Sequence, residues 1–206
     1  TSAVQNGVGI TLLQSIRQLP ASWWKLVPND RCGYDYRTRP RIVGIPTEAL
    51  LDGGAGVNSI AEEAVVGKIN AARILGIGLN DPRFPILYFE RWPEEESVVG
   101  IVKGKNIQIL GAALMRVELV EQGKDKGPEI IVRAKVFANG ASDFIGLILG
   151  ARSLDCVERD GLGFRPAAGG HVFDKFGIVM ARTEHLPTPE HYRDEAYRTM
   201  PCVGGE

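Results

Sequence analysis

An apolar strand that runs directly into an aspartate and a run of glycines is the feature that most limits what this chain can fold into. The segment reads Ala49-Leu50-Leu51-Asp52-Gly53-Gly54-Ala55. Residues 48–51 are predicted to form a short strand, and the glycines allow a tight turn directly after it. Glycine also lets neighbouring backbone approach closely. The pattern therefore predicts a carboxylate held on a tight turn at the end of a strand.

Short apolar runs separated by turn residues make up most of the middle of the chain. The predicted strands cover residues 41–45, 48–51, 84–90, 98–102, 107–110, 114–120, 130–137 and 144–149. Pro46-Thr47 predicts the turn of a hairpin between the first two. One helix is predicted over 60–75, with Asn58 or Ser59 as its cap. Many short strands with few helices indicate a mostly β fold, a small barrel or a sandwich.

The composition divides the chain into three parts. We predict an N-terminal extension over 1–40, a central domain over 41–154 and a C-terminal extension over 155–206. The first part holds a short helical pattern and the adjacent Trp23 and Trp24, which need a surface to cover them. The last part contains several glycines, and its end is rich in proline and charge, so we expect little core-forming content and an extended backbone over 185–206.

The Asp52 segment resembles the active-site turn of the retropepsin-type, or retroviral-type, aspartic proteases. That family places two apolar residues before Asp, Thr or Ser, Gly and Ala. Leu147-Ile148-Leu149-Gly150, followed by residues 151–154, resembles the second motif of the family, an apolar run with a glycine and a short helix. The resemblance covers about residues 41–154. It implies a small closed barrel with one or two short helices, in which Asp52 and Gly150 lie close together.

The same resemblance implies a flap, the glycine-bearing hairpin that closes over a bound peptide. The matching segment is 98–106, and its flap residues are Gly100, Val102, Lys103 and Gly104. Gly111 resembles the glycine that opens the strand after the flap.

Aspartic proteases activate water with two carboxylates that share one proton, because two like charges so close together cannot both ionise. Only one such motif occurs here, since Asp143, Asp155 and Asp160 lack the preceding apolar strand and the following Gly-Ala. The resemblance therefore implies a twofold homodimer with one Asp52 from each chain at the axis. Asp52, Gly53, Gly54 and Ala55 would form the catalytic turn.

Gly53 departs from the family pattern. In the family, the Thr or Ser hydroxyl at this place bonds across the dimer axis and fixes the two aspartates. Its loss removes two hydrogen bonds per dimer, each worth about 0.5–1.5 kcal/mol net. We therefore expect a pseudoenzyme without efficient proteolysis, which serves through protein–protein interaction as a structural or binding subunit of a larger assembly. The alternative is an active homodimeric aspartic endopeptidase.

Other function classes find no support in the sequence. The net charge of −1, with scattered Lys and Arg, lacks the basic footprint of a nucleic-acid binder. An apolar content of 44% and a charged content of 24% are typical of a soluble protein, and no apolar run reaches the length of a membrane helix. We expect no cofactor and no metal, because His185 and His191 are badly spaced for zinc and Gly53-Gly54-Ala55-Gly56 lacks the lysine of a phosphate-binding loop.

Three cysteines, Cys32, Cys156 and Cys202, are far apart and odd in number. They indicate reduced thiols and favour a reducing, intracellular compartment. The chain begins at Thr1 rather than Met, which is compatible with a removed leader and an organellar location. The sequence alone does not decide whether a leader was removed.

Overall fold

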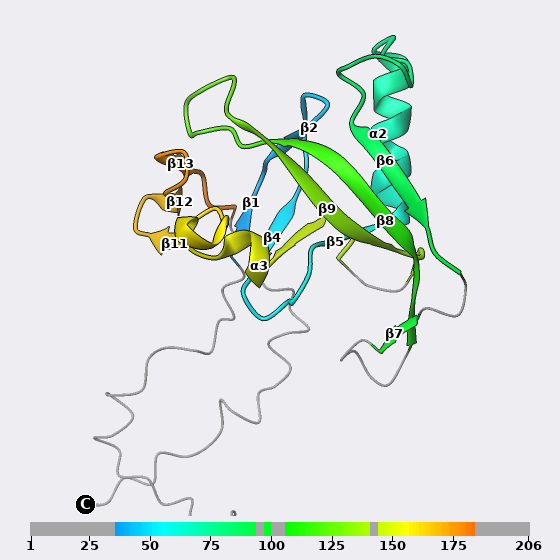
Figure 1. Ribbon diagram of the computed structural model, residues 1–206. Helices are drawn as coiled ribbons and strands as arrows, with labels where there is room; N and C mark the ends of the chain where they lie inside the picture. The colour runs from blue at the N-terminus through cyan, green and yellow to red at the C-terminus, as the bar shows by residue number, and fades with distance from the viewer. Residues whose placement is uncertain (1–35, 94–96, 100–105, 141–143, 184–206) are drawn as a thin grey trace, which may run out of the picture. The chain divides into compact units, whose positions relative to one another are not determined.

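Two long antiparallel strands, β8 (Asn106–Glu118) and β9 (Glu129–Phe137), pair with each other in the main sheet (Figure 1). The computed structural model describes residues 36–93, 97–99, 106–140 and 144–183, and all that follows concerns these residues. The strand order is β1-β4-β10-β5-β9-β8-β2-β3, and β6 and β7 also pair with β8. The other strands of this sheet are β1 (Arg37–Thr38), β2 (Arg41–Ile42), β3 (Ile45–Pro46), β4 (Ala49–Asp52), β5 (Ser59–Ala61), β6 (Ile86–Arg91), β7 (Ser97–Val99) and β10 (Leu147–Gly150).

The fold is mostly β with helices α2 (Glu62–Ile74) and α3 (Ala151–Leu154), as predicted. The prediction of a closed barrel is wrong, because the described sheet ends at β1 on one side and at β3 on the other without closing. Both edges consist of strands only two residues long.

The first predicted strand is in fact a hairpin. Val43 and Gly44 both have positive φ, 51° and 75°, and they form the two-residue turn between β2 and β3. Paired positive φ values suit the right-handed twist of a hairpin. The predicted turn at Pro46-Thr47 is therefore misplaced, since Pro46 lies in β3. Valine rarely adopts positive φ, so the residue types at 43 and 44 do not predict this turn.

Two of the predicted strands, 107–110 and 114–120, belong to the single strand β8. The register shifts between Ile109 and Gly111, which marks a bulge. A Cβ added at Gly111 would lie 2.0 Å from the Glu90 carbonyl oxygen on β6. Gly111 therefore does not open a strand; it lets β6 pass close to the bulge inside β8.

Helix α2 occupies the predicted place, but its predicted caps are wrong. The capping residue is Ala61, which makes no side-chain capping bond. The Asn139 side chain accepts the backbone N–H of Glu63 instead, at 2.9 Å. An acceptor 76 residues away in the chain replaces the local one that the sequence suggested. Ser59 lies in β5, and Asn58 has a different role.

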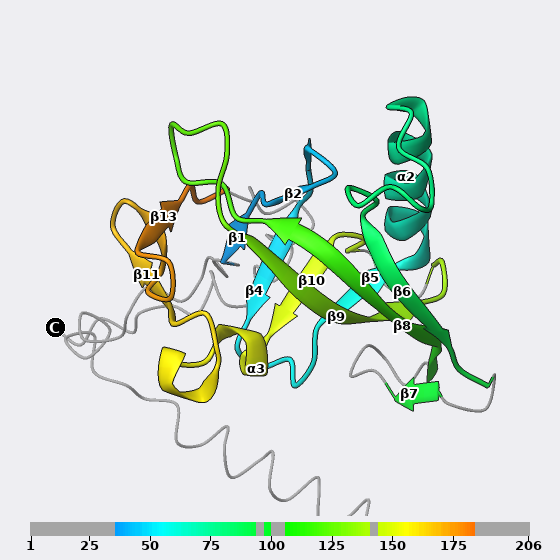
Figure 2. The ribbon, with the colours of Figure 1, turned by 45° about the horizontal axis from the view of Figure 1, so that its top comes forward.

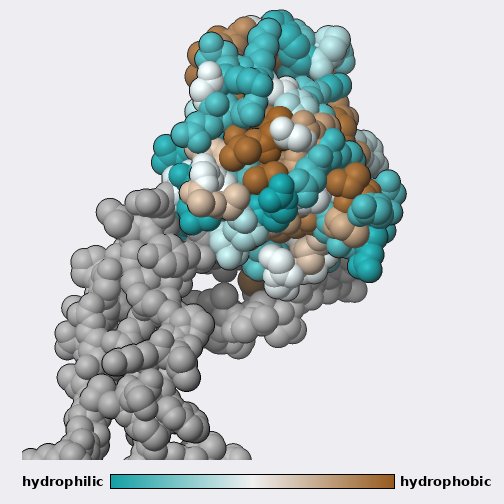
Figure 3. Space-filling model, turned by 90° about the vertical axis from the view of Figure 1, so that its left-hand side faces the viewer, coloured by the Kyte–Doolittle hydropathy of each residue, from teal (hydrophilic) through white to brown (hydrophobic). Residues whose placement is uncertain are grey.

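A second sheet follows the predicted domain. It contains β11 (Phe164–Ala167), β12 (Gly170–Phe173) and β13 (Ile178–Met180), all antiparallel. Phe173 and Met180 are 0% and 1% exposed and belong to the main core cluster with Leu51 and Leu149. Residues 155–183, which we assigned to the C-terminal extension, therefore contribute to the core. Figure 3 views the side of the molecule that carries this sheet, where apolar side chains are exposed in small groups among polar ones.

The N-terminal side of the predicted domain is also extended by packing. Strand β1 pairs with β4, and Thr38 in β1 is only 1% exposed. Sheet and core thus continue beyond both predicted limits, 41 and 154. Residues 1–35 and 184–206, to which the helical pattern, the tryptophan pair and the extended tail were assigned, lie outside the described residues.

If the second sheet is part of the core, Phe173→Ala will lower the free energy of unfolding by about 3–5 kcal/mol, because it opens a cavity among buried side chains. Urea-induced unfolding followed by circular dichroism measures the change. Ile131→Ala is the control, since Ile131 is 50% exposed and its loss should cost less than about 1 kcal/mol. Equal effects of the two variants would contradict the packing of this sheet.

Candidate active site

Asp52 ends strand β4 and forms the turn that follows it. Its Oδ1 accepts the backbone N–H of Gly54 at 2.8 Å and that of Ala55 at 3.3 Å. The Ala55 N–H also lies 3.1 Å from the Asp52 carbonyl oxygen. An aspartate whose carboxylate accepts N–H groups two and three residues ahead is a local reason for a tight turn. The carboxylate is thereby held in one orientation, half-buried at the end of the strand.

Strand β10 lies between β4 and β5 (Figure 2). It runs parallel to β4, with Gly150 opposite Asp52, and antiparallel to β5, with Leu147 opposite Ile60. The chain therefore leaves β4 through the Asp52 turn and returns as β5 on the other side of β10. Helix α3 begins directly after Gly150. The prediction that Asp52 and Gly150 lie close together is confirmed.

The described residues have a retropepsin-like fold. The arrangement that decides it is the Asp52 turn at the end of one strand, joined to a parallel Gly-terminated strand and a short helix. No family model and no curated protein matches this chain.

Three solved structures that the chain resembles are retropepsin-like. The retroviral protease-like domain of Ddi1 from Leishmania major shares 16% identity over 74% of this chain and 94% of its own, with a TM-score of 0.41. The EIAV protease, complexed with the inhibitor HBY-793, shares 20% over 64% and 95%, with a TM-score of 0.35. A retropepsin-like aspartic protease from Rickettsia conorii shares 14% over 66% and 85%, with a TM-score of 0.28.

Gly150 is confined by the loop that follows the Asp52 turn. A Cβ at this position would lie 2.6 Å from the carbonyl oxygens of both Ala55 and Val57. The next residue, Ala151, donates its N–H to the Ala55 carbonyl at 2.7 Å. Only a glycine lets the end of β10 approach the retropepsin-like turn so closely.

Asn58 holds the same region together and was not predicted as a site residue. Its Oδ1 accepts the Gly150 N–H at 3.0 Å, and its Nδ2 donates to the Arg133 carbonyl at 3.1 Å. Its backbone carbonyl accepts the Lys135 N–H at 2.9 Å. One side chain thus joins the loop after Asp52 to β10 and β9. Both side-chain bonds reach residues more than 70 positions away, so no local pattern could have shown them.

Gly53 and Gly54 differ in the space around them. A Cβ at Gly53 would meet nothing within 4 Å, whereas a Cβ at Gly54 would lie 3.2 Å from Asp52 Oδ1. The fold of one chain therefore leaves room for Thr or Ser at 53, the residue types that the family has there. At 54, any side chain would press on the carboxylate.

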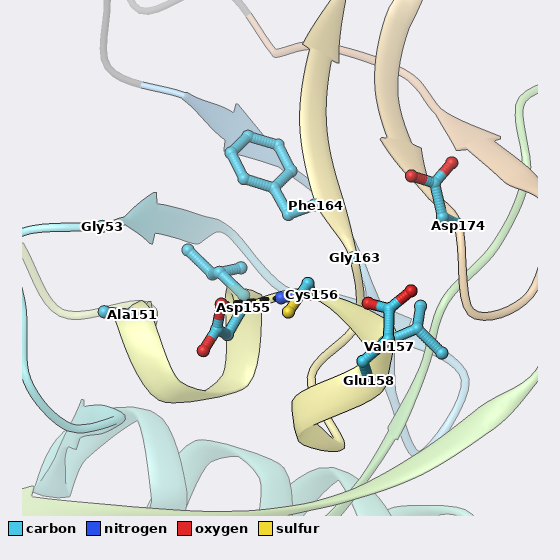
Figure 4. Close-up of a pocket in the computed structure, with 10 residues that line it drawn as sticks. Gly53, Ala151, Asp155, Cys156, Val157, Glu158, Gly163, Phe164 and Asp174 are labelled. Atoms are coloured by element: carbon cyan, nitrogen blue, oxygen red, sulfur yellow. Dashed lines mark hydrogen bonds between the residues drawn. The ribbon is translucent and has the colours of Figure 1, made fainter.

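A cavity of about 450 Å³ lies beside Gly53 (Figure 4). Its apolar walls come from Leu154, Val157 and Phe164, and its polar groups include Asp155, Glu158 and Asp174. The pKa of Asp155 is held below its ordinary value, chiefly because its carboxylate accepts the Cys156 N–H at 2.8 Å. The sequence did not predict this cavity, because most of its residues lie in the part assigned to the C-terminal extension.

The predicted flap residues Gly100, Val102, Lys103 and Gly104 lie outside the described residues. The strands on either side of them are described: β7 pairs with β8, and Val99 lies opposite Asn106. These strands are the two arms of a hairpin, as a flap would require. The assignment of the flap itself stays a prediction.

Within the described ranges, no group of His, Cys, Asp or Glu side chains is arranged to hold a metal ion. None of the helices described is long and apolar enough to cross a membrane.

The contact at Gly150 gives a prediction with a matched control. Gly150→Ala will lower the free energy of unfolding by at least about 2 kcal/mol, because backbone oxygens cannot move aside as a flexible side chain would. Gly53→Ala will leave it unchanged or raise it by up to about 1 kcal/mol, because the site is open and alanine restricts the unfolded chain. Thermal and urea-induced unfolding measure both. A tolerated Gly150→Ala would contradict the close contact between β10 and the Asp52 loop.

Proposed function

We propose that this chain is a retropepsin-like domain without efficient proteolysis, which serves as a structural or binding subunit of a larger protein assembly. The observation that carries the proposal is Gly53, an exposed glycine directly after Asp52. It offers no side chain to a second chain, although the surrounding space would admit one.

The Asp52 turn is complete within one chain. Two backbone N–H groups hold the carboxylate, and β10 and Asn58 support the loop beneath it. The interaction that Gly53 cannot make therefore lies between two chains, where the hydroxyl of the retropepsin pattern would donate across the twofold axis. Without that bond, each chain of a dimer loses about 0.5–1.5 kcal/mol of net hydrogen bonding at the contact.

Catalysis depends on that contact because one chain supplies one motif. General acid–base catalysis requires two carboxylates within hydrogen-bond reach of one water molecule. Among the described residues, no second carboxylate is hydrogen-bonded to Asp52. A displacement of about 1 Å between reacting groups can cost on the order of a hundredfold in rate. A loosened pair of chains would accordingly cleave peptides poorly.

A binding role has its own support around the turn. Val57, in the loop after Asp52, is 48% exposed, and Val157, in the wall of the cavity beside Gly53, is 41% exposed. The cavity with Val157 in its wall, and the exposed Val57 in the loop after Asp52, are apolar features that a protein partner would cover. That partner would cover the face that a second copy covers in an active retropepsin.

The second candidate is an active homodimeric aspartic endopeptidase. The observation that favours it is the intact hydrogen bonding of the Asp52 carboxylate to Gly54 and Ala55. In that case Asp52 of each chain would act as general base and acid on water, and an extended peptide would bind beneath the hairpin of β7 and β8.

A peptide-cleavage assay separates the two candidates. We expect the purified chain to show no efficient cleavage of a mixed peptide library, even at about pH 4–5, where a shared-proton dyad is active. Asp52→Asn is the control, and its residual activity should equal that of the unmodified chain. Robust cleavage that Asp52→Asn abolishes and a statine-type inhibitor blocks would overturn the proposal and establish the protease.

Self-association tests the role of position 53 directly. Gly53→Thr restores a hydroxyl where space exists, and we expect it to tighten self-association by about fivefold, the equivalent of two hydrogen bonds at the low end of their net range. Sedimentation velocity over a concentration series measures this. Gly56→Thr is the matched control, since a Cβ at Gly56 also meets nothing within 4 Å. Equal association of the two variants would show that position 53 does not govern the contact.

A further inference from the structure

His171 lies at the junction between the second sheet and the first strand of the main sheet. It belongs to β12, is 0% exposed, and its Nε2 lies 3.0 Å from the carbonyl oxygen of Arg37 in β1. The same carbonyl accepts the N–H of Thr183 at 2.8 Å. A carbonyl can only accept, so Nε2 carries the proton and donates it. The neutral imidazole then has its lone pair on Nδ1.

Nδ1 has no polar partner among the described residues, and aromatic rings pack against the imidazole. Nδ1 is buried, and no described residue forms a hydrogen bond to it. The rings of Tyr36 and Phe164 lie at 5.8 Å and 5.5 Å between centroids from the imidazole. The unpaired Nδ1 lone pair of a neutral imidazole is tolerated among aromatic rings. Protonation would convert it into a charged N–H donor that has no acceptor, which is far more costly to bury.

The charged groups of the surrounding elements do not offer compensation. On β1, the Arg37 guanidinium binds Glu48 at 2.7 Å. On β11, Arg165 binds Asp174, which follows β12, at 3.1 Å. After β13, the positive charge of Arg182 opposes protonation of His171. The ladder neighbours of His171, Pro166 and Met180, are uncharged.

We propose that His171 is an acid-sensitive latch, which holds the β11–β13 sheet against β1 while its imidazole is neutral and releases the sheet when it is protonated. The other described polar bonds between this sheet region and the rest are few. Thr38 Oγ1 donates to the Ala181 carbonyl at 3.0 Å, and the Gln122 N–H donates to the Val179 carbonyl at 3.0 Å. Release of this small sheet before the main sheet fits the way proteins open by parts.

The direction of the pH effect follows from burial. Burial lowers the pKa of His171 below its ordinary 6.5, the Arg37 carbonyl partly restores it, and the charge of Arg182 lowers it further. Because the folded pKa lies below that of the opened state, the opened state binds more protons between the two values. The latch is therefore fully effective above pH 6.5 and is lost as the pH falls from there through the folded pKa. Each unit of pKa lowering corresponds to about a tenfold shift toward the opened state in acid.

Release of the β11–β13 sheet would also change the candidate active site. Phe164, which packs on His171, is also a wall of the cavity beside Gly53. Phe173, two residues after His171, is fully buried in the main core. Acid would thus alter the cavity next to Asp52 and expose part of the core. The proposal rests on the junction alone and holds whether the chain is a protease or a binding subunit.

Hydrogen exchange measured by mass spectrometry on the full chain tests the latch. After correction for the intrinsic effect of pH, lowering the pH from about 7.5 to about 5 should raise exchange in 164–180 by about tenfold and leave β8 and β9 unchanged. His171→Gln keeps an N–H for the Arg37 carbonyl but cannot be protonated, and it should abolish the difference. The double variant His185→Gln/His191→Gln removes the other two histidines and should retain it. An equal response in all segments, or a response that persists in His171→Gln, would overturn the proposal.

A measurement on the unmodified chain covers the case in which His171→Gln does not fold. Nitrogen-15 chemical shifts of the histidine side chains report tautomer and pKa together. We expect His171 to carry its proton on Nε2 at neutral pH and to titrate below 6.5. Titration at or above that value, or a proton on Nδ1, would overturn the latch.

Discussion

The contact between the end of β10 and the loop after Asp52 is the constraint on which the rest of the structure depends. The contact is between backbone atoms. Ala151 donates its N–H to the Ala55 carbonyl, and two carbonyl oxygens leave no room for a Cβ at Gly150. Because β10 lies between β4 and β5, this one contact fixes both legs of the Asp52 turn. The buried leucines of β4 and β10 supply the packing beneath it.

That constraint is internal to the chain, and it is intact. The departure from the retropepsin sequence pattern lies at Gly53, where nothing in the chain's own packing depends on a side chain. Folding and catalysis therefore place separate demands on adjacent residues. Asp52 satisfies the first by accepting N–H groups of its own turn, while the second needs a group that reaches another chain. A chain can lose the second without any cost to its fold.

Sequence reasoning succeeded where the signal is local. The Asp52 turn and the Gly150 motif are strings of neighbouring residues whose geometry follows from apolar alternation and glycine. It failed where long-range contacts decide: Asn58 bonds to residues over 70 positions away, and Asn139 replaces the local cap of α2. The second sheet was missed because its many glycines suggested a loose tail. Three of them, at 161, 163 and 170, in fact permit close approach of packed backbone and side chains.

The second sheet gives the retropepsin-like domain a property that its central motif lacks. The contact between Gly150 and the loop after Asp52 joins backbone to backbone, and backbone groups do not titrate over the physiological range. The junction at His171 relies on an imidazole that does. The cavity beside Gly53 has walls from both regions, since Gly53 belongs to the turn and Phe164 to the second sheet. A partner that binds there would contact a surface in which the wall formed by the second sheet depends on the protonation of His171. Its affinity would then fall in acid even if its own charges did not change.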